Sequence, residues 1–116
     1  MKTSGTKNAG HPKAVSFLLA KCIRAAKTGV YFSSHAVIRM RQRCILPSEI
    51  VEGLPGADVV DEYPDDERGE SVLCLISGDR PFHVHVAPKP YGLVVVTCYE
   101  PGMDKWCKDL KTRRKR

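Results

Sequence analysis

The stretch SVLCLISGDRPFHVHVA, residues 71–87, has two runs of β-branched, aromatic and other apolar side chains on either side of Gly78-Asp79. A Gly-Asp pair between such runs is typical of a two-residue β-hairpin turn. Two antiparallel strands are expected here: residues 71–77 and 81–87. The tight turn would pair Leu75 with Phe82. This register predicts a core face with four apolar side chains: Leu73, Leu75, Phe82 and Val84.

Alternation along the strands also predicts what lies on their other faces. The second face of the hairpin would be half polar, with Cys74, Ile76, His83 and His85. Turns rich in Pro and Gly bound two further strands, residues 58–63 and 93–99. On the last strand, alternation predicts one face with Leu93, Val95, Thr97 and Tyr99.

Helical periodicity predicts three helices ahead of these strands, at residues 12–28, 34–44 and 47–54. Ser33 or Ser34 can cap the second helix, directly after the short link Tyr31-Phe32. Helices followed by consecutive hairpin strands are typical of an α+β fold. We therefore predict N-terminal helices packed on one face of a four-stranded antiparallel sheet.

The length of 116 residues suits one domain with a single modest core. We predict three parts: a disordered basic N-terminus at residues 1–10, a single α+β domain at 11–110, and a basic tail at 111–116. Trp106 is expected to anchor a final turn or short helix near the end of the domain.

The net charge of +6 conceals a segregated pattern. Residues 1–45 hold nine Lys/Arg and no Asp/Glu, residues 46–80 hold ten Asp/Glu against two Arg, and residues 81–116 hold eight Lys/Arg against three Asp/Glu. Segregated charge of this kind favours one basic face that attracts an anion such as nucleic acid.

Other features indicate a cytoplasmic protein without a cofactor. The chain has no apolar run of membrane-spanning length and no secretion signal, so no membrane partner is expected. The five cysteines are scattered without a Cys-x-x-Cys pair, which favours free thiols in a reducing compartment. A zinc site built from Cys74, Cys98 and the nearby histidines remains an alternative.

His35, Arg39 and Arg43 are spaced four residues apart within the predicted second helix. That spacing stacks them on one helical face. Imidazole can transfer a proton near neutral pH, and guanidinium groups bind phosphate in a fixed fork. The stripe therefore suits an enzyme that acts on a phosphodiester, although an ordinary solvated helix face can look the same.

Metal-independent RNA cleavage needs these residue types. The substrate's own 2′-OH attacks the phosphorus, so the protein must transfer protons and stabilise extra negative charge. His35 and His83 would be the proton-handling pair, and Arg39 and Arg43 would hold the phosphate. Thr97 and Tyr99 are supporting catalytic candidates through their hydroxyl groups, although both are also ordinary strand residues.

An ordered set of short motifs resembles a bacterial family known as domain of unknown function 4258. The matching residues are Ser34-His35, Arg39-Met40, Arg43, Pro47-x-Glu49-Ile50, Gly78-x-Arg80-Pro81-x-His83-Val84, Val96-Thr97-x-Tyr99-Glu100-Pro101 and Trp106. That family is similar to the RelE/ParE-like toxins of toxin–antitoxin pairs, whose genes often lie beside a small antitoxin gene. The resemblance implies a small α+β ribonuclease fold, with helices first and an antiparallel sheet after them. It further implies a site marked by His35, Arg39, Arg43 and His83.

These expectations combine into a toxin-like, metal-independent endoribonuclease that acts on RNA, free or on the ribosome, and is held by a small antitoxin. The alternative is a non-catalytic module that binds nucleic acid or an antitoxin. In that alternative the basic tail would contribute phosphate contacts alongside Arg39 and Arg43. The tail residues concerned are Lys111, Arg113, Arg114, Lys115 and Arg116.

Overall fold

The computed structural model describes residues 16–114, which form an α+β fold. The helices are α1 (Phe17–Ala26), α2 (Ser34–Arg43) and α3 (Pro47–Gly53), followed by a short 3-10 turn, η1 (Leu54–Gly56). The strands are β1 (Val30–Phe32), β2 (Asp58–Tyr63), β3 (Ser71–Ile76), β4 (Phe82–Lys89) and β5 (Gly92–Tyr99). The predicted α+β class is confirmed. Residues 1–10, which are expected to be disordered, lie outside the described residues. Lys115 and Arg116 of the predicted basic tail lie outside them as well.

Helix α1 begins later than predicted. Ser16 has an extended backbone, and its side chain accepts a hydrogen bond from the Leu19 backbone N–H at 3.0 Å. A serine in this position is an N-cap, so α1 starts at Phe17, and the part of the predicted helix at residues 12–15 lies outside the described residues.

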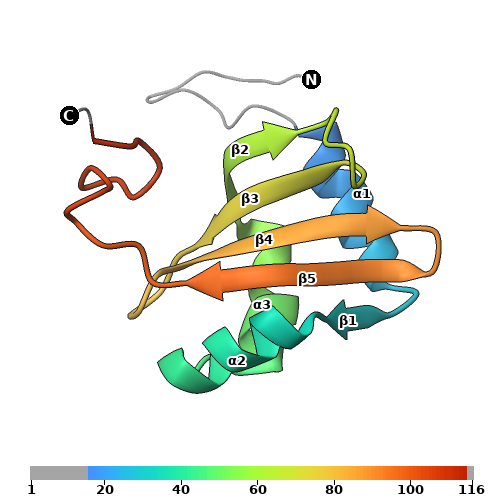
Figure 1. The fold of residues 1–116 in the computed structure, drawn as a ribbon, viewed down its shortest axis with the longest axis horizontal. Coiled ribbons are helices and arrows are strands. Elements are labelled where there is room, and N and C mark those ends of the chain that lie inside the picture. Colours follow the sequence, from blue (N-terminus) through green and yellow to red (C-terminus); the bar gives the residue numbers. More distant parts are fainter. Residues whose placement is uncertain (1–15, 115–116) are drawn as a thin grey trace.

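The sheet has five strands in the order β1-β5-β4-β3-β2, one more than predicted (Figure 1). The additional strand, β1, contains the residues that the sequence suggested were only a link. It pairs in parallel with β5, with Val30 opposite Leu93 and Phe32 opposite Val95. The sheet is therefore mixed. Three residues are too few to show alternation, and the partner strand is remote in sequence.

The β3–β4 register differs by one residue from the predicted one. Leu75 lies opposite His83, not opposite Phe82, and Ile76 is the residue that pairs with Phe82. The connection consequently spans residues 77–81, in which Pro81 has no backbone N–H to donate to a tighter ladder. A one-residue shift exchanges the faces of the strand that moves. The residues of this pair that face the core are Val72, Cys74, Ile76, Phe82, Val84 and Val86.

A β-bulge corrects the prediction for β5. His85 pairs with Thr97, but Val86 pairs with Val95, so Val96 is an extra residue on the β5 side. The bulge reverses the alternation between the two halves of the strand. Thr97 therefore does not share a face with Val95, and Tyr99 does not either. Both lie on the face of His83 and His85, whereas Leu93 and Val95 are buried in the core.

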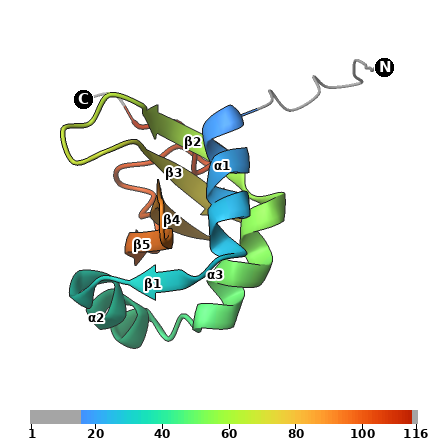
Figure 2. The ribbon, with the colours of Figure 1, turned by 90° about the vertical axis from the view of Figure 1, so that its right-hand side faces the viewer.

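The helices form two groups around the sheet. Figure 2 shows α1 and α3 together on one side of the sheet, while α2 lies beside β1 and β5. Cys22 of α1 and Ile50 of α3 are fully buried in one apolar cluster with Val84 and Val95 of the sheet. The predicted packing of helices on one face therefore holds for α1 and α3, while α2 covers the end of the sheet next to β1.

Part of the other face of the sheet, around His83, packs against the segment 101–114, which follows β5. Trp106 is 5% exposed, and its ring packs edge-on against the ring of His83 at a centroid distance of 4.5 Å. The predicted anchoring by Trp106 is confirmed, although the segment consists of turns and an isolated bridge between Trp106 and Arg113. Leu73 and Leu75 are buried on this face as well.

Within residues 16–114 we find neither a metal site nor a membrane span. No group of three or more His, Cys, Asp or Glu side chains in this range could hold a metal ion, and none of its helices combines the length and apolar character needed to cross a bilayer. All five cysteines are free thiols, as expected. Burial raises the pKa of Cys74 to about 12, and Cys98 is fully buried in the apolar cluster. The zinc alternative therefore finds no support in this range.

Ser33 attaches α2 to the sheet. Its hydroxyl group donates to the Val96 carbonyl at 2.7 Å and accepts from the Ala36 backbone N–H at 3.0 Å. Its own N–H donates to the Val95 carbonyl at 3.0 Å. Of the two serines that could have capped the helix, Ser33 is therefore the cap, and it also bonds to β5 where β1 ends.

We expect Ser33→Ala to lower the free energy of unfolding by about 1–2 kcal/mol, because it removes the N-cap acceptor and leaves the Val96 carbonyl without its donor. The neighbouring Ser34→Ala is the matched control and should change stability by less than about 0.5 kcal/mol, since Ser34 is exposed. Urea denaturation followed by circular dichroism gives both values. Equal losses in the two variants would contradict this role of Ser33.

Candidate nucleic-acid interface on helix α2

The three residues of the predicted stripe lie on α2 beside the end of β5. Ala36 and Met40 bury one side of the helix. His35 is exposed at the first turn, Arg39 is half-buried, and the Arg43 side chain is 48% exposed. The predicted helix is confirmed at these positions, so the spacing of four does place the side chains in successive turns.

Two residues absent from the predicted site join this stripe. The Glu100 carboxylate lies 3.9 Å from an Arg43 guanidinium nitrogen and 3.9 Å from an Arg80 guanidinium nitrogen. Arg80 also donates a hydrogen bond of 3.0 Å to the carbonyl of Cys44, the C-cap residue of α2. The β3–β4 connection thus contributes a third arginine next to α2. No local pattern in the sequence indicated this meeting, because Arg80 is 36 residues from Cys44.

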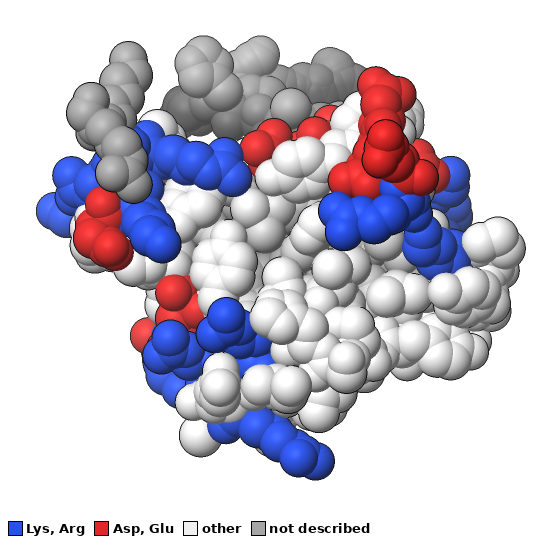
Figure 3. Space-filling view, viewed as in Figure 1, with Lys and Arg blue, Asp and Glu red and all other residues white. Residues whose placement is uncertain are grey.

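The charge distribution of the surface agrees with this arrangement. Figure 3 shows blue side chains gathered at the lower left, where Figure 1 places α2. The first 45 residues contain no carboxylate, so α2 has no acidic side chain of its own to neutralise its arginines. Glu100 is the carboxylate that the structure pairs with Arg43. The result is a basic surface with the chemistry to bind a phosphate group.

His83 lies in a different environment from His35. It has no exposed surface, and both ring nitrogens are bonded. Nε2 lies 2.6 Å from the Leu110 carbonyl oxygen, which can only accept, so Nε2 carries the proton. Nδ1 therefore accepts from the Tyr99 hydroxyl group at 3.1 Å. His83 is therefore not accessible as a member of the predicted proton-handling pair with His35, because it is enclosed between the sheet and the segment 101–114.

Burial also changes the titration of the groups around His83. Loss of solvent lowers the pKa of His83, partly opposed by its bond to the Leu110 carbonyl, and Arg113 lowers the pKa further. Burial raises the pKa of Tyr99. Both groups are thus held in their neutral forms. Thr97, which pairs with His85 in the ladder, is half-buried on the same face and belongs to these surroundings, not to α2.

The described part of the basic tail makes internal contacts. The Arg113 guanidinium stacks 4.8 Å from the centre of the Trp106 ring and donates to Asp61 at 3.2 Å. The Arg114 side chain donates to the carbonyls of Met103 and Trp106, and Lys111 lies 3.9 Å from an Asp58 carboxylate oxygen. Arg113 and Lys111 fasten the segment 101–114 to β2, while the Arg114 side chain holds the segment together internally. Lys111, Arg113 and Arg114 were predicted to contact phosphate, but in the structure each of these side chains already contacts another part of the protein.

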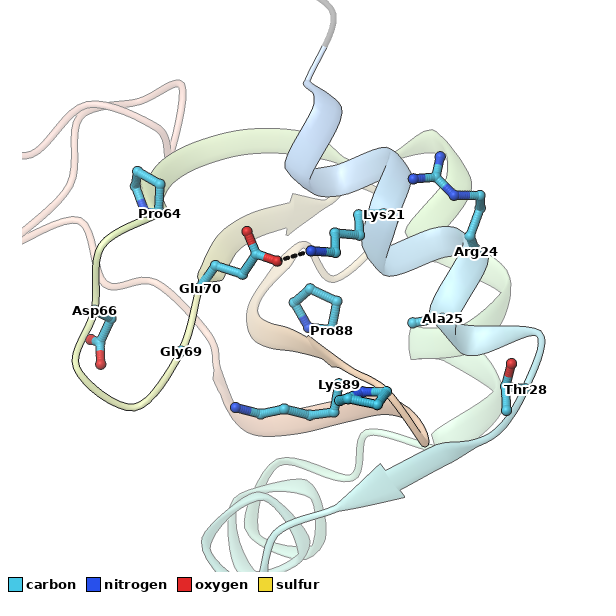
Figure 4. Close-up of a pocket in the computed structure, with 11 residues that line it drawn as sticks. Lys21, Arg24, Ala25, Thr28, Pro64, Asp66, Gly69, Glu70, Pro88 and Lys89 are labelled. Carbon is cyan, nitrogen blue, oxygen red and sulfur yellow. Dashed lines mark hydrogen bonds and ion pairs between the residues drawn. The ribbon is translucent and has the colours of Figure 1, made fainter.

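An open cavity of about 720 Å³ lies away from α2, between α1 and the β2–β3 and β4–β5 connections (Figure 4). Lys21 on its wall is bonded to Glu70, and the Lys89 ammonium group donates to the Arg68 carbonyl at 2.8 Å. Two of the cations that line this cavity therefore already have partners. Asp66 and Glu70 also line the cavity, so its charge is mixed and it is a weaker candidate for an anion site than the surface on α2.

We expect the free energy of unfolding to fall as the pH is lowered. The pKa of His83 is lower in the folded protein than its unfolded value of 6.5. His83 therefore contributes stability above pH 6.5, and this stability is lost as the pH falls toward the folded pKa. The fluorescence of Trp106, the one tryptophan, should report urea unfolding at about pH 7.5 and about pH 5.5. His85, whose pKa burial also lowers, contributes to the same change.

His83→Gln should reduce this pH dependence, while His35→Gln, a change at an exposed histidine, should preserve it. If the difference between the two pH values were as large in His83→Gln as in the unmodified protein, His83 would not be the neutral buried group described above.

The comparisons with known proteins agree with the motif pattern. No curated protein and no solved structure matches the chain. The family model described as Domain of unknown function (DUF4258) matches residues 32–100, which run from the end of β1 to the residue after β5. This range includes the α2 stripe, Arg80, His83 and Glu100, and it amounts to more than half of the chain. The chain therefore belongs to the DUF4258 family.

Proposed function

We propose that this protein binds RNA along α2 and cleaves it as a toxin-like, metal-independent endoribonuclease. The observation that carries the proposal is the alignment of His35, Arg39 and Arg43 along α2, with Arg80 and Arg43 sharing Glu100 at the end of the helix. RNA carries one phosphate per nucleotide, and successive turns of α2 offer groups that can contact phosphate oxygens.

The chemistry assigns one role to each type of side chain. The RNA 2′-oxygen forms a bond to phosphorus while the bond from phosphorus to the 5′-oxygen breaks, which leaves a 2′,3′-cyclic phosphate and a 5′-hydroxyl group. His35 would accept the proton of the 2′-OH, and water would protonate the departing 5′-oxygen. Arg39 and Arg43 would stabilise the additional negative charge on the phosphorane oxygens.

His35 takes this role alone, because His83 is not exposed to a substrate. A mechanism that uses His35 and His83 as a pair is therefore not part of this proposal. Tyr99 also leaves the catalytic set, since its hydroxyl group is bonded to His83. Thr97 leaves it because it lies opposite His85 on the same face as His83, not on α2.

The enclosure of His83 favours a second candidate function, a module that binds RNA or a small antitoxin without turnover. Such a module needs only the arginines of α2 and Arg80 and no group that transfers protons. The two candidates differ in the fate of the RNA, so a single cleavage assay separates them.

We expect the purified protein to shorten a labelled single-stranded RNA in the presence of a chelator, with 2′,3′-cyclic phosphate ends. His35→Ala should slow cleavage about 10²-fold or more, the usual contribution of a general base. Electrophoresis of the RNA under single-turnover conditions measures the rate. RNA left intact by the unmodified protein would exclude the nuclease, and equal cleavage by His35→Ala would exclude this site.

Binding should depend on the stripe in both candidates. Arg39→Ala should weaken RNA binding and lower the slope of log affinity against log salt by about 0.7, as expected for the loss of one phosphate contact to a single strand. Arg41→Ala is the matched control, because Arg41 lies off the stripe and lines the apolar groove next to Met40 and Leu46. Fluorescence anisotropy over a salt series measures both. Equal losses would favour a general charge effect over a defined interface.

A further inference from the structure

Glu100 lies in the position that a phosphate group would need between two arginines. Its two carboxylate oxygens each face a different guanidinium, Oε1 toward Arg43 and Oε2 toward Arg80, both at 3.9 Å. Arg43 comes from α2 and Arg80 from the β3–β4 connection, so the carboxylate bridges two separate elements at the end of β5.

The Arg80 side chain is positioned independently of Glu100. It donates at 3.0 Å to the carbonyl of Cys44, which caps α2 in the left-handed conformation with φ of 55°. The C-terminal carbonyls of a helix carry partial negative charge and lack partners within the helix, so they favour a cation at this position. Arg80 would therefore remain beside α2 if the Glu100 carboxylate moved away.

The contact between Glu100 and the arginines is loose. A distance of 3.9 Å is longer than a charge-assisted hydrogen bond, and all three side chains are 37–50% exposed. Exposed ion pairs of this kind contribute little stability. One carboxylate also leaves one of the two positive charges uncompensated. A phosphate group offers more acceptor oxygens with the geometry that guanidinium forks bind best.

We infer that Glu100 is a built-in competitor for a phosphate subsite formed by Arg43 and Arg80, and that a phosphate group must displace it to bind. This inference rests on the proposed function, and it adds Arg80 and the regulation by Glu100 to the interface. The subsite takes a phosphate of a polynucleotide or of an inorganic polyphosphate. A carboxylate that remains near the bound phosphate lowers the affinity, which limits binding to ligands with several phosphates.

The experiment uses two probes with the full-length chain. One is a single-stranded 2′-O-methyl RNA, which has no 2′-OH and cannot be cleaved by the proposed mechanism, and the other is inorganic tripolyphosphate. Glu100→Gln keeps the size of the side chain and removes its charge. It should tighten the binding of both probes about fivefold at low salt, the effect of one unit charge about 4 Å from another in water.

Glu67→Gln is the matched control, since it removes the same charge from the exposed β2–β3 connection. It should leave both affinities unchanged. In an Arg80→Gln background, Glu100→Gln should have a smaller effect, because one of the two guanidinium groups that the carboxylate occupies is gone. Isothermal titration calorimetry gives the affinities, and circular dichroism confirms that each variant is folded.

Unchanged or weaker binding of tripolyphosphate by Glu100→Gln would overturn the inference even if the protein binds and cleaves RNA. An equal gain in Glu67→Gln would overturn it as well, since net charge would then explain the change. If Glu100→Gln gains affinity for tripolyphosphate while no variant binds RNA, the subsite stands and the proposed function fails.

Discussion

The pairing of β4 with its two neighbours controls where the chemistry of the sheet lies. His83 is opposite Leu75 on one side and opposite Tyr99 on the other, which sends its imidazole away from the helices. Val84, one residue later, is fully buried in the core under α1 and α3. A slip of one residue would exchange these positions and place an imidazole without partners among apolar side chains, at a large cost in stability. The register therefore separates a structural histidine from the candidate site.

The pairing of β4 with β5 also contains the β-bulge at Val96. The bulge at Val96 turns Thr97 and Tyr99 toward the face of His83 and His85, and the Val96 carbonyl accepts a hydrogen bond from the Ser33 hydroxyl group. Helix α2 therefore begins where β1 ends, and its arginines meet the end of β5 and the β3–β4 connection. The bulge at Val96 thus has two effects. It turns the hydroxyl groups of Thr97 and Tyr99 away from the predicted site, and it offers the carbonyl that holds the start of α2.

Local patterns in the sequence predicted the positions of helices and strands better than the strand register and the long-range contacts between elements. The helical spacing of His35, Arg39 and Arg43 predicted a stripe that α2 does form. The turn at Gly78-Asp79 is present but longer than predicted, because a Gly-Asp pair favours a two-residue turn whereas Pro81 has no N–H for the tighter ladder. Arg80 and Glu100 were missing from the candidate site, since only the folded chain brings them beside Arg43.

The amino-acid sequence was sufficient for the α+β class, the basic helix, the anchoring tryptophan and the family. All of these depend on residues close together in the chain or on the order of motifs. The folded arrangement was needed to learn that β1 completes the sheet, that His83 is buried and neutral, and that Arg113 stacks on Trp106 and is not free for a ligand. Burial and long-range pairing depend on contacts between residues far apart in sequence, and a side chain's chemical role changes with those contacts because they decide its exposure and its charge.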